Sequence, residues 1–390
     1  MNAASPSDRA TVLVNLLWLV PGVVGGSEDS LTDALRGIAA AAPDDLQVRL
    51  AVLEPFAAAH PDLADAFPLE VLADDGTNKA RRVLAEQTWL ARTARRTDAR
   101  VVHHAGGTVP FAHPGRVVLT IQDLQPLDLP HNFSMVKRSY LATMLGRSAR
   151  AADVVHVPSE FTRERVVTLL GVDAGRVRVV PWSTRPPAAG RSVELSAAQA
   201  AGVVPDVPYL LYPAITYPHK NHRILLDAAA RLQGDAAESV LVLTGGASGA
   251  EGEIAERIDA LGLTDRVWRT GRVGAERLDA LYAGACGVLV PSRYEGFGLP
   301  ALEAMQRGCP VAVARSGSLP EVVGEESLVD PDDVTAWTDA MQALLSMSEA
   351  DRSARVARGH ELAARFGRGR TADGLLDAYR SALAGDRPFS

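Results

Sequence analysis

Two glutamates bracket a glycine-rich run that could bind a sugar and an anion. Glu295 precedes Gly296-Phe297-Gly298-Leu299-Pro300, and Glu303 follows that run, just after an apolar segment. Pro suits the first turn of a helix, so the pattern predicts a strand, a loop and a helix that ends before Gly308. Free amides at a helix start favour an anion. Glu303 could accept hydrogen bonds from a vicinal diol such as a ribose, and Glu295 from a sugar.

A second candidate is a group of basic side chains at the expected start of a helix over residues 220–232. His219, Lys220, His222 and Arg223 crowd this point. Cations at a helix N-terminus oppose the dipole by about 0.3–1 kcal/mol each, whereas a bound dianion reverses that sign. Lys220, one of only three lysines in the chain, is therefore the candidate ligand of a diphosphate. The alternative is a solvated basic helix end.

These motifs resemble the signature of family 4 of the retaining GT-B glycosyltransferases. The resembling stretch carries Pro-Ser, then Glu-Gly-Phe-Gly-Leu-Pro, then the second glutamate, and the similarity runs from about Val12 to Tyr379. The resemblance implies that Glu295 contacts the donor sugar and that Glu303 binds the nucleotide ribose. It also implies that the amides of Gly296, Phe297, Gly298 and Leu299 hold sugar hydroxyls and phosphate.

The resemblance implies further donor-side positions. Many relatives carry Gly where Ala214 stands and an Arg just beyond it. Here Ile215 follows Ala214, so the second phosphate-binding cation is unassigned. The remaining implied donor positions are the Gly25-Gly26 loop, which closes over phosphates and sugar, and Arg272 and Val273 near the nucleobase, with a surface side chain as the alternative for Arg272. Gly245 follows the expected strand over residues 240–244, at a turn that either approaches a ligand closely or simply ends the strand.

The N-terminal half carries two polar strand ends. His104, Gly106 and Gly107 resemble the acceptor-side loop of the family. Neighbouring residues of a strand point to opposite faces, so the alternative is one buried and one exposed histidine, and a metal site is not expected. Gln122-Asp123 stands where many relatives place His-Asp near the transferred sugar. Gln can hydrogen-bond a hydroxyl but cannot act as a base.

Three short polar segments are expected to cap helices. They are Ser27, Ser159 and the Asp330-Pro331-Asp332 run, which also resembles a metal-binding motif.

Alternating strands and helices predict an α/β protein with parallel sheets wound on both faces. The expected strands are Val12–Leu19, Val48–Leu53, Val101–His104, Val117–Ile121, Val154–Val157, Val177–Pro181, Tyr209–Tyr212, Val240–Thr244, Val267–Thr270, Val288–Val290 and Val311–Ala314. The resemblance implies a GT-B architecture of two Rossmann-like domains facing across a cleft. Residues 1–182 would bind the acceptor and residues 206–370 the donor, joined by a linker over 183–205. A last helix within 371–390 would cross back to the first domain.

Composition restricts the class of protein. The 390 residues are 47% hydrophobic and 22% charged, with a net charge of −7, which suits two soluble domains and argues against nucleic-acid binding. Two cysteines indicate a reducing, cytoplasmic setting. The apolar run over residues 11–24 reads as a buried strand rather than a signal peptide. The basic helix over residues 78–96 is expected to pack its apolar side inward, with weak peripheral membrane contact as the lesser alternative.

The sequence therefore predicts a retaining transferase that moves a hexosyl group, with mannose favoured, from a nucleotide-diphosphate sugar such as GDP-mannose. The acceptor would be a glycan, a lipid-linked sugar or a small molecule, and neither metal nor cofactor is expected. Three alternatives remain open: a glycoside hydrolase using Glu295 and Glu303, a sugar-nucleotide epimerase, and a non-catalytic nucleotide-sugar-binding protein.

Overall fold

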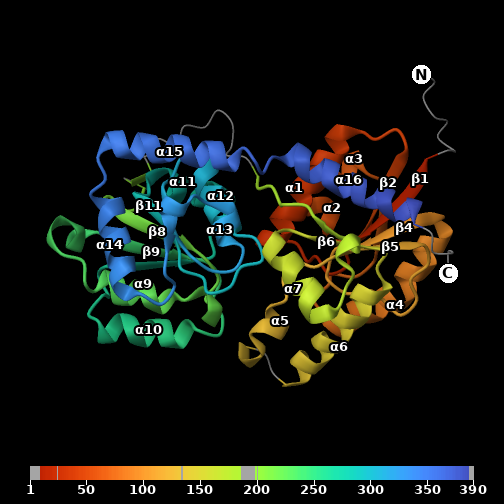
Figure 1. The fold of residues 1–390 in the computed structure, drawn as a ribbon, viewed down its shortest axis with the longest axis horizontal. Helices are drawn as coiled ribbons and strands as arrows, with labels where there is room; N and C mark the ends of the chain where they lie inside the picture. Colours follow the sequence, from red (N-terminus) through yellow and green to blue (C-terminus); the bar gives the residue numbers. More distant parts are fainter. Residues whose placement is uncertain (1–8, 24, 133–134, 186–197, 200, 386–390) are drawn as a thin grey trace. The chain divides into compact units, whose positions relative to one another are not determined.

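The chain forms two units, seen here in a computed structural model (Figure 1). The structure describes residues 9–23, 25–132, 135–185, 198–199 and 201–385. Unit 1 spans residues 1–184 and 366–390, and unit 2 spans residues 185–365. Most of the predicted linker and the end of the predicted crossing segment lie outside the described residues.

Unit 1 is built on a parallel sheet of seven strands in the order β3-β2-β1-β4-β5-β6-β7. Its strands are β1 (Ala10–Asn15), β2 (Leu46–Leu53), β3 (Leu69–Leu72), β4 (Ala99–His104), β5 (Arg116–Thr120), β6 (Val154–Val157) and β7 (Val177–Val179). Its helices are α1 (Gly26–Ala41), α2 (Phe56–Ala59), α3 (Pro61–Ala66), α4 (Lys79–Arg96), α5 (Gln125–Asp128), η2 (Pro130–Asn132), α6 (Met135–Ala151), α7 (Glu160–Leu170), η3 (Ala174–Arg176) and α16 (Arg368–Ala384).

Unit 2 repeats this plan with six parallel strands in the order β10-β9-β8-β11-β12-β13. Its strands are β8 (Tyr209–Pro213), β9 (Val240–Thr244), β10 (Val267–Gly271), β11 (Gly287–Val290), β12 (Val311–Ala314) and β13 (Leu328–Val329). Its helices are η4 (Pro218–Lys220), α9 (His222–Ala229), η5 (Gly234–Glu238), α10 (Glu251–Ala260), α11 (Ala275–Gly284), α12 (Leu299–Gln306), α13 (Leu319–Val322), η6 (Glu325–Ser327), α14 (Val334–Leu345) and α15 (Glu349–Ala363).

The first strand is shorter at its end than predicted. Val12, Leu13 and Val14 are fully buried because helices cover both faces of the sheet. The strand stops at Asn15, whose Oδ1 accepts a hydrogen bond from the Leu17 amide at 3.1 Å, so the predicted extension to Leu19 is wrong. The short strands β3 and β13 were not predicted from the sequence, since four and two residues give little periodicity.

Both sheets reverse their strand order at one point. In unit 1 this point lies between β1 and β4, and in unit 2 between β8 and β11. Doubly wound sheets bind ligands at the carboxyl ends of the strands beside such a switch point. The loops after these four strands are therefore the places to look for a site.

The last helix, α16, belongs to unit 1 although its sequence follows unit 2. It packs against α1 and against β4, β5 and β6. A Cβ on Gly37 would lie 2.8 Å from the Ala372 Cβ, so α1 and α16 touch closely. Arg368 Nε donates to Asp33 at 2.8 Å, and Asp33 is fully buried. The helix starts at Arg368, three residues before the predicted position.

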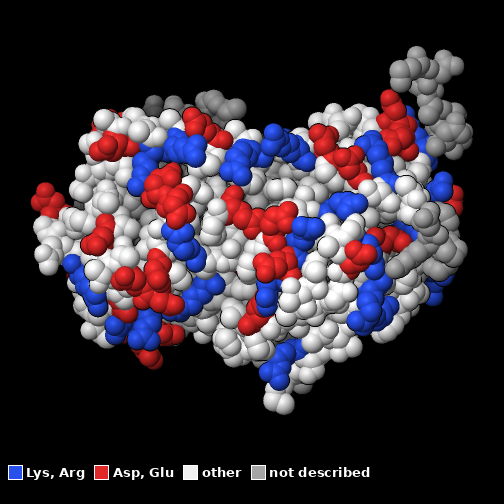
Figure 2. Space-filling view, viewed as in Figure 1, with Lys and Arg blue, Asp and Glu red and all other residues white. Residues whose placement is uncertain are grey.

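Surface charge is mixed, and Figure 2 shows blue and red side chains interspersed on the face drawn.

The prediction that the basic helix over residues 78–96 packs its apolar side inward is only half right. Leu90 and Ala94 of α4 are buried, but Val83 and Leu84 are 44% and 62% exposed. Among the described residues, no helix combines the length and the apolar character that crossing a membrane needs.

Candidate functional site

The turn between β8 and α9 carries Lys220. This lysine ends the short helix η4, and α9 begins only at His222, so the predicted helix start at residue 220 is wrong. The break is Asn221, which adopts a left-handed conformation with φ 54°. Its Nδ2 donates to the Pro291 and Pro331 carbonyls at 3.2 and 2.9 Å. Asn221 therefore ties the Lys220 turn to the loops after β11 and β13.

Lys220 and Glu295 form an ion pair across the switch point of unit 2. Lys220 Nζ lies 2.6 Å from Glu295 Oε1, and their side chains are only 18% and 12% exposed. The buried Tyr212 donates its hydroxyl to the Lys220 carbonyl at 2.7 Å. The charge of Lys220 thus has a protein partner, and the picture of a solvated basic helix end does not hold for this residue.

The backbone of Glu295 contacts Ser318 and Gly317, two residues that lie outside the motifs identified in the sequence. The Glu295 carbonyl accepts from the Ser318 hydroxyl at 3.0 Å and from the Ser318 amide at 3.2 Å. Gly317 has φ +54°, and a Cβ there would lie 2.7 Å from the Glu295 carbonyl oxygen. In the sequence, only the Ser-Gly-Ser run after β12 could have indicated this contact with the Glu295 backbone.

The predicted helix after the glycine-rich run is confirmed as α12, with a proline in its first turn. Gly298 precedes it with φ +112°, and Gly308 follows it with φ +68°. Glu303 lies inside the helix and accepts a hydrogen bond from the Tyr282 hydroxyl at 2.8 Å. Burial and the neighbouring Glu303 carboxyl raise the pKa of Tyr282 well above its ordinary value, so this phenol stays a hydrogen-bond donor.

Four other predicted donor positions, Ala214, Gly245, Arg272 and Val273, lie on the loops after β8, β9 and β10. Gly245 has φ +147°, and a Cβ there would overlap the Ala214 carbonyl. A Cβ on Gly246 would lie 3.4 Å from Arg272 Nη2, so Arg272 reaches the same turn, with Val273 half-buried beside it. Close backbone packing against Ala214 explains why glycine is needed at position 245.

In unit 1, the Gly25-Gly26 turn begins α1 differently from the prediction. Gly25 is the N-cap residue, with φ 76° and ψ −139°, and Ser27 lies inside the first turn. The expected Ser27 cap is therefore wrong, because glycine reaches a conformation that admits the helix two residues earlier. A Cβ on Gly25 would meet no atom of the described residues within 4 Å.

The alternative of one buried and one exposed histidine on β4 is also wrong. His103 and His104 are 0% and 1% exposed, because helices cover both faces of the sheet. His103 Nδ1 lies 2.9 Å from the Tyr379 hydroxyl, and His103 Nε2 lies 2.7 Å from Thr120 Oγ1. Thr120 Oγ1 lies 2.9 Å from His156 Nδ1, and His156 Nε2 lies 2.9 Å from the Val180 carbonyl.

The proton positions in this chain of hydrogen bonds can be deduced. A carbonyl only accepts, so His156 Nε2 carries the proton and its Nδ1 accepts from Thr120. Thr120 then accepts from His103 Nε2, and Tyr379 donates to His103 Nδ1. Burial lowers the pKa of His156 to about 4 and that of His103 well below its ordinary value, which keeps both rings neutral as this arrangement requires.

His104 points to the opposite face of the sheet from His103. It belongs to a cluster of side chains that was not predicted from the sequence. It pairs in register with Asn15 of β1, whose Nδ2 donates to Glu86 Oε1 at 3.4 Å. Burial raises the pKa of Glu86 to about 7. A Cβ on Gly106 would lie 2.7 Å from the Trp18 ring, and Gly107 has φ +86°. Asn15, at the same end of the sheet as the predicted acceptor-side residues, thus contacts a half-buried carboxyl of α4.

Gln122 and Asp123 follow β5. Gln122 Oε1 accepts from the Trp182 indole at 2.6 Å, and Asp123 Oδ1 accepts from the Gln125 amide at 3.0 Å. Asp123 therefore supports the start of α5.

Two caps differ in outcome. Ser159 is confirmed as the cap of α7, since its hydroxyl accepts from the Thr162 amide. Asp330 and Asp332 do not cap α14. Asp333 does so, because its carboxylate reaches the Thr335 and Ala336 amides, while Asp332 pairs with Arg293. Within the described part of the chain, no three His, Cys, Asp or Glu side chains gather where they could hold a metal ion.

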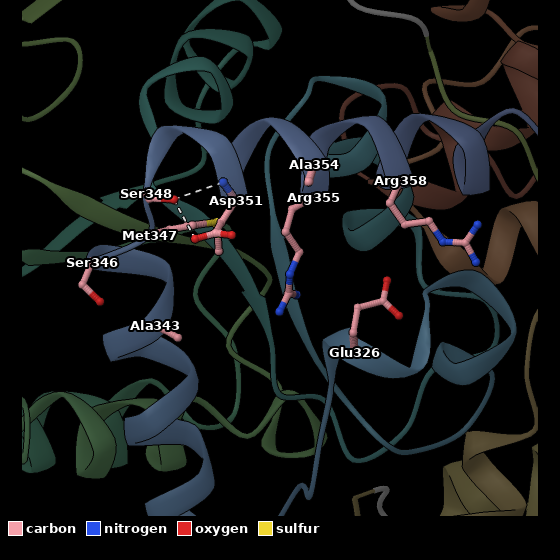
Figure 3. A pocket seen from close by; sticks show the side chains of 9 residues that line it. All are labelled: Glu326, Ala343, Ser346, Met347, Ser348, Asp351, Ala354, Arg355 and Arg358. Carbon is pink, nitrogen blue, oxygen red and sulfur yellow. Dashed lines mark hydrogen bonds between the residues drawn. The ribbon is translucent and has the colours of Figure 1, made fainter.

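Unit 2 also has an open hollow of about 630 Å³ between η6, α14 and α15. Figure 3 shows Glu326 pointing toward the helix that carries Arg355 and Arg358, with Ser348 bonded to Asp351. None of the predicted site residues lines this hollow.

Buried histidines predict a loss of stability in acid. His222 is 2% exposed against the Tyr212 ring, and burial and Lys220 lower its pKa to about 4. The unfolded chain takes up a proton near pH 6.5, whereas the folded chain does not. From pH 6.5 down to 4, we expect each such histidine to remove up to about 1.4 kcal/mol of unfolding free energy per pH unit.

Urea unfolding at pH 7, 6 and 5 measures this slope. A His222→Phe variant should show a shallower slope than the wild type, and a variant of the exposed His131 should not. Identical slopes in all three proteins would contradict the prediction.

Comparison with known proteins gives the family. The model for "Glycosyl transferases group 1" matches residues 197–359, and that for "Glycosyltransferase Family 4" matches residues 24–182. O-antigen chain mannosyltransferase B of Escherichia coli is 31% identical over 275 residues, which cover 68% of this chain and 70% of that protein. The chain belongs to the family 4 glycosyltransferases.

Other relatives are D-inositol 3-phosphate glycosyltransferases. The one from Xylanimonas cellulosilytica is 34% identical over 246 residues, covering 60% of this chain but only 58% of that protein. Among solved structures, Anabaena Alr3699/HepE in complex with UDP and glucose has a TM-score of 0.73 at 20% identity, covering 96% of this chain and all of that one. Sucrose-phosphate synthase from Thermosynechococcus elongatus has a TM-score of 0.74 at 22% identity, with 96% and 100% coverage. These likenesses show the GT-B fold.

Proposed function

We propose that this glycosyltransferase moves a hexosyl group, with mannose favoured, from a nucleotide-diphosphate sugar to a hydroxyl acceptor, with retention and without a metal. The observation that carries the proposal is the Lys220–Glu295 pair, which lies 2.6 Å apart at the switch point of unit 2. A cation for a diphosphate and a carboxylate for a sugar are thus held side by side. The O-antigen mannosyltransferase relative supports mannose.

In the proposed reaction, the bond from the anomeric carbon to the phosphate oxygen breaks and a bond to the acceptor oxygen forms. Lys220 and the amides at the start of α12 stabilise the departing diphosphate. A diphosphate oxygen receives the proton of the acceptor hydroxyl. Glu303 holds the ribose, aided by the hydrogen bond from Tyr282 that orients its carboxylate. Residues of unit 1 bind the acceptor, and His104, Gly106 and Gly107 form part of that site.

The relatives also suggest a second acceptor class. Several of them are D-inositol 3-phosphate glycosyltransferases, so a phosphorylated cyclitol belongs among the acceptors to be assayed.

Calorimetric titration with GDP, UDP, ADP and dTDP tests the donor site. We expect one diphosphate to bind selectively, equally well in EDTA, and at least about tenfold more weakly to Glu303→Ala, because a hydrogen bond to a charged group contributes about 1.5–3 kcal/mol. Glu349→Ala on the exposed first turn of α15 is the matched control and should bind normally.

Product analysis then separates the alternatives. A transferase makes product only with acceptor present, a hydrolase releases free sugar without it, and an epimerase converts the donor alone. If no nucleotide binds to the wild type, the proposed donor site is refuted.

A further inference from the structure

The half-buried carboxyl of Glu86 lies at the switch point of the sheet in unit 1. Asn15 ends β1 and pairs in register with His104, the last residue of β4, so these two residues mark the switch point. Asn15 Nδ2 donates to Glu86 Oε1 at 3.4 Å, which places the side chain of Glu86, from α4, at the carboxyl edge of the sheet. Ligands of doubly wound domains bind at this edge.

The orientation of Asn15 determines which oxygen of Glu86 is occupied. Asn15 is 1% exposed, and its Oδ1 accepts from the Leu17 amide at 3.1 Å. Because a backbone N–H only donates, the oxygen of the Asn15 side chain must face Leu17 and the nitrogen must face Glu86. Glu86 Oε2 has no hydrogen-bond partner among the described residues, and solvent reaches it. One oxygen of this carboxyl is thus held in place, and the other is available to a ligand.

The charge of Glu86 is not cancelled by its neighbours. Arg82, one turn earlier on α4, donates Nη1 to the Trp18 carbonyl at 2.8 Å. His104 adds no charge, because burial lowers its pKa to about 3. Within the part of the chain that the structure describes, Glu86 forms no ion pair, and burial raises its pKa to about 7. Above that pH the edge of the sheet carries a negative charge at this point.

We propose that Glu86 accepts a hydrogen bond from a hydroxyl of the acceptor and selects an uncharged sugar or cyclitol over a phosphorylated one. This inference rests on the glycosyl transfer proposed above and names the chemical class of its acceptor. An ionised carboxylate only accepts hydrogen bonds, so a hydroxyl satisfies it. A phosphate group brings a like charge, which costs binding free energy. A phosphorylated cyclitol, the acceptor class that the relatives suggest, should therefore be a poor substrate.

Paired acceptors test the selectivity at pH 8, where Glu86 is ionised. The pairs are methyl α-mannoside with its 6-phosphate, and myo-inositol with D-inositol 3-phosphate. We expect the best acceptor to be an uncharged one, at least about 30-fold above its phosphate ester in kcat/KM, because like charges placed together disfavour the ester. A wild type that prefers a phosphate ester would overturn the inference.

A Glu86→Gln variant removes the charge and keeps the shape of the side chain. We expect the KM for the uncharged acceptor to rise about tenfold, because a hydrogen bond to a charged group is lost, while kcat changes little. The preference over the phosphate ester should shrink to less than about fivefold. Glu164→Gln, exposed on α7, is the matched control and should keep wild-type values. An unchanged preference in Glu86→Gln would contradict the assigned role.

A second readout does not depend on turnover. Carbodiimide coupling to glycine ethyl ester modifies carboxyl groups that solvent reaches, and peptide mass spectrometry reports Glu86 by itself. With the nucleoside diphosphate bound, we expect methyl α-mannoside or myo-inositol to slow this modification at least about threefold by mass action, and the phosphate esters to leave it unchanged. Equal rates with every compound would refute the inference but leave the donor site intact. A wild type that binds no nucleotide would instead refute the proposed function.

Discussion

A Lys220→Met variant is expected to lose about 100-fold to 1,000-fold in kcat/KM, the usual loss when one donor that stabilises transition-state charge is removed. Lys220 is paired and largely buried beside Glu295, and the proposed function assigns its ammonium to the departing diphosphate. Steady-state kinetics with the donor selected by the titration measures the effect. Lys79→Met, at the exposed start of α4, is the matched control and should retain full activity.

Stability and catalysis can be separated in the same experiment. Removing Lys220 alone leaves the Glu295 carboxylate half-buried without its cation, which should lower the unfolding free energy by about 1–3 kcal/mol. The double variant Lys220→Met/Glu295→Gln removes that unpaired charge, so its stability should recover while its activity stays lost. Wild-type kcat/KM in Lys220→Met would show that the diphosphate is bound elsewhere.

A Gly317→Ala variant is the second change with a large expected effect. The new Cβ would lie 2.7 Å from the Glu295 carbonyl oxygen and 3.0 Å from its amide nitrogen. The loop that contains Glu295 must then shift, and this loop carries the carboxylate that faces Lys220. We expect kcat/KM to fall about 10-fold to 100-fold, since a displacement of about 1 Å can cost that much. Kinetics and thermal unfolding measure the two effects.

Gly262→Ala provides the matched control. Gly262 has φ +64°, close to the +54° of Gly317, but a Cβ there meets nothing within 4 Å. Both variants should lose about 1–2 kcal/mol of stability from the left-handed backbone, and only Gly317→Ala should lose activity. Equal activities would show that the Glu295 loop tolerates the displacement.

Local patterns were enough to predict part of this structure. The helix after the glycine-rich run, its closing Gly308 and the Ser159 cap follow from residues a few positions apart. Alternating apolar runs and helices were likewise sufficient for two parallel doubly wound sheets. These features depend on short-range backbone chemistry, which sequence displays directly.

The remaining features depend on contacts between distant segments. The Lys220–Glu295 pair joins residues 75 positions apart, and the burial of both β4 histidines depends on helices on two faces. Position 317 requires glycine because a Cβ there would clash with the Glu295 backbone. The prediction that Ser27 caps α1 is wrong for another reason. Gly25 is the N-cap, two residues earlier, and composition alone does not reveal this helix start.

The place of α16 has a consequence for the order in which the chain can fold. Unit 2 is one continuous segment, so its sheet can form as soon as residue 365 has left the ribosome. Unit 1 lacks α16, the helix that covers β4, β5 and β6, until Arg368–Ala384 are made. Until then His103 has no Tyr379 to bond and Asp33 has no Arg368. The strands of unit 1 are therefore made before unit 2 but finish packing after it, which exposes the sheet of unit 1 during synthesis.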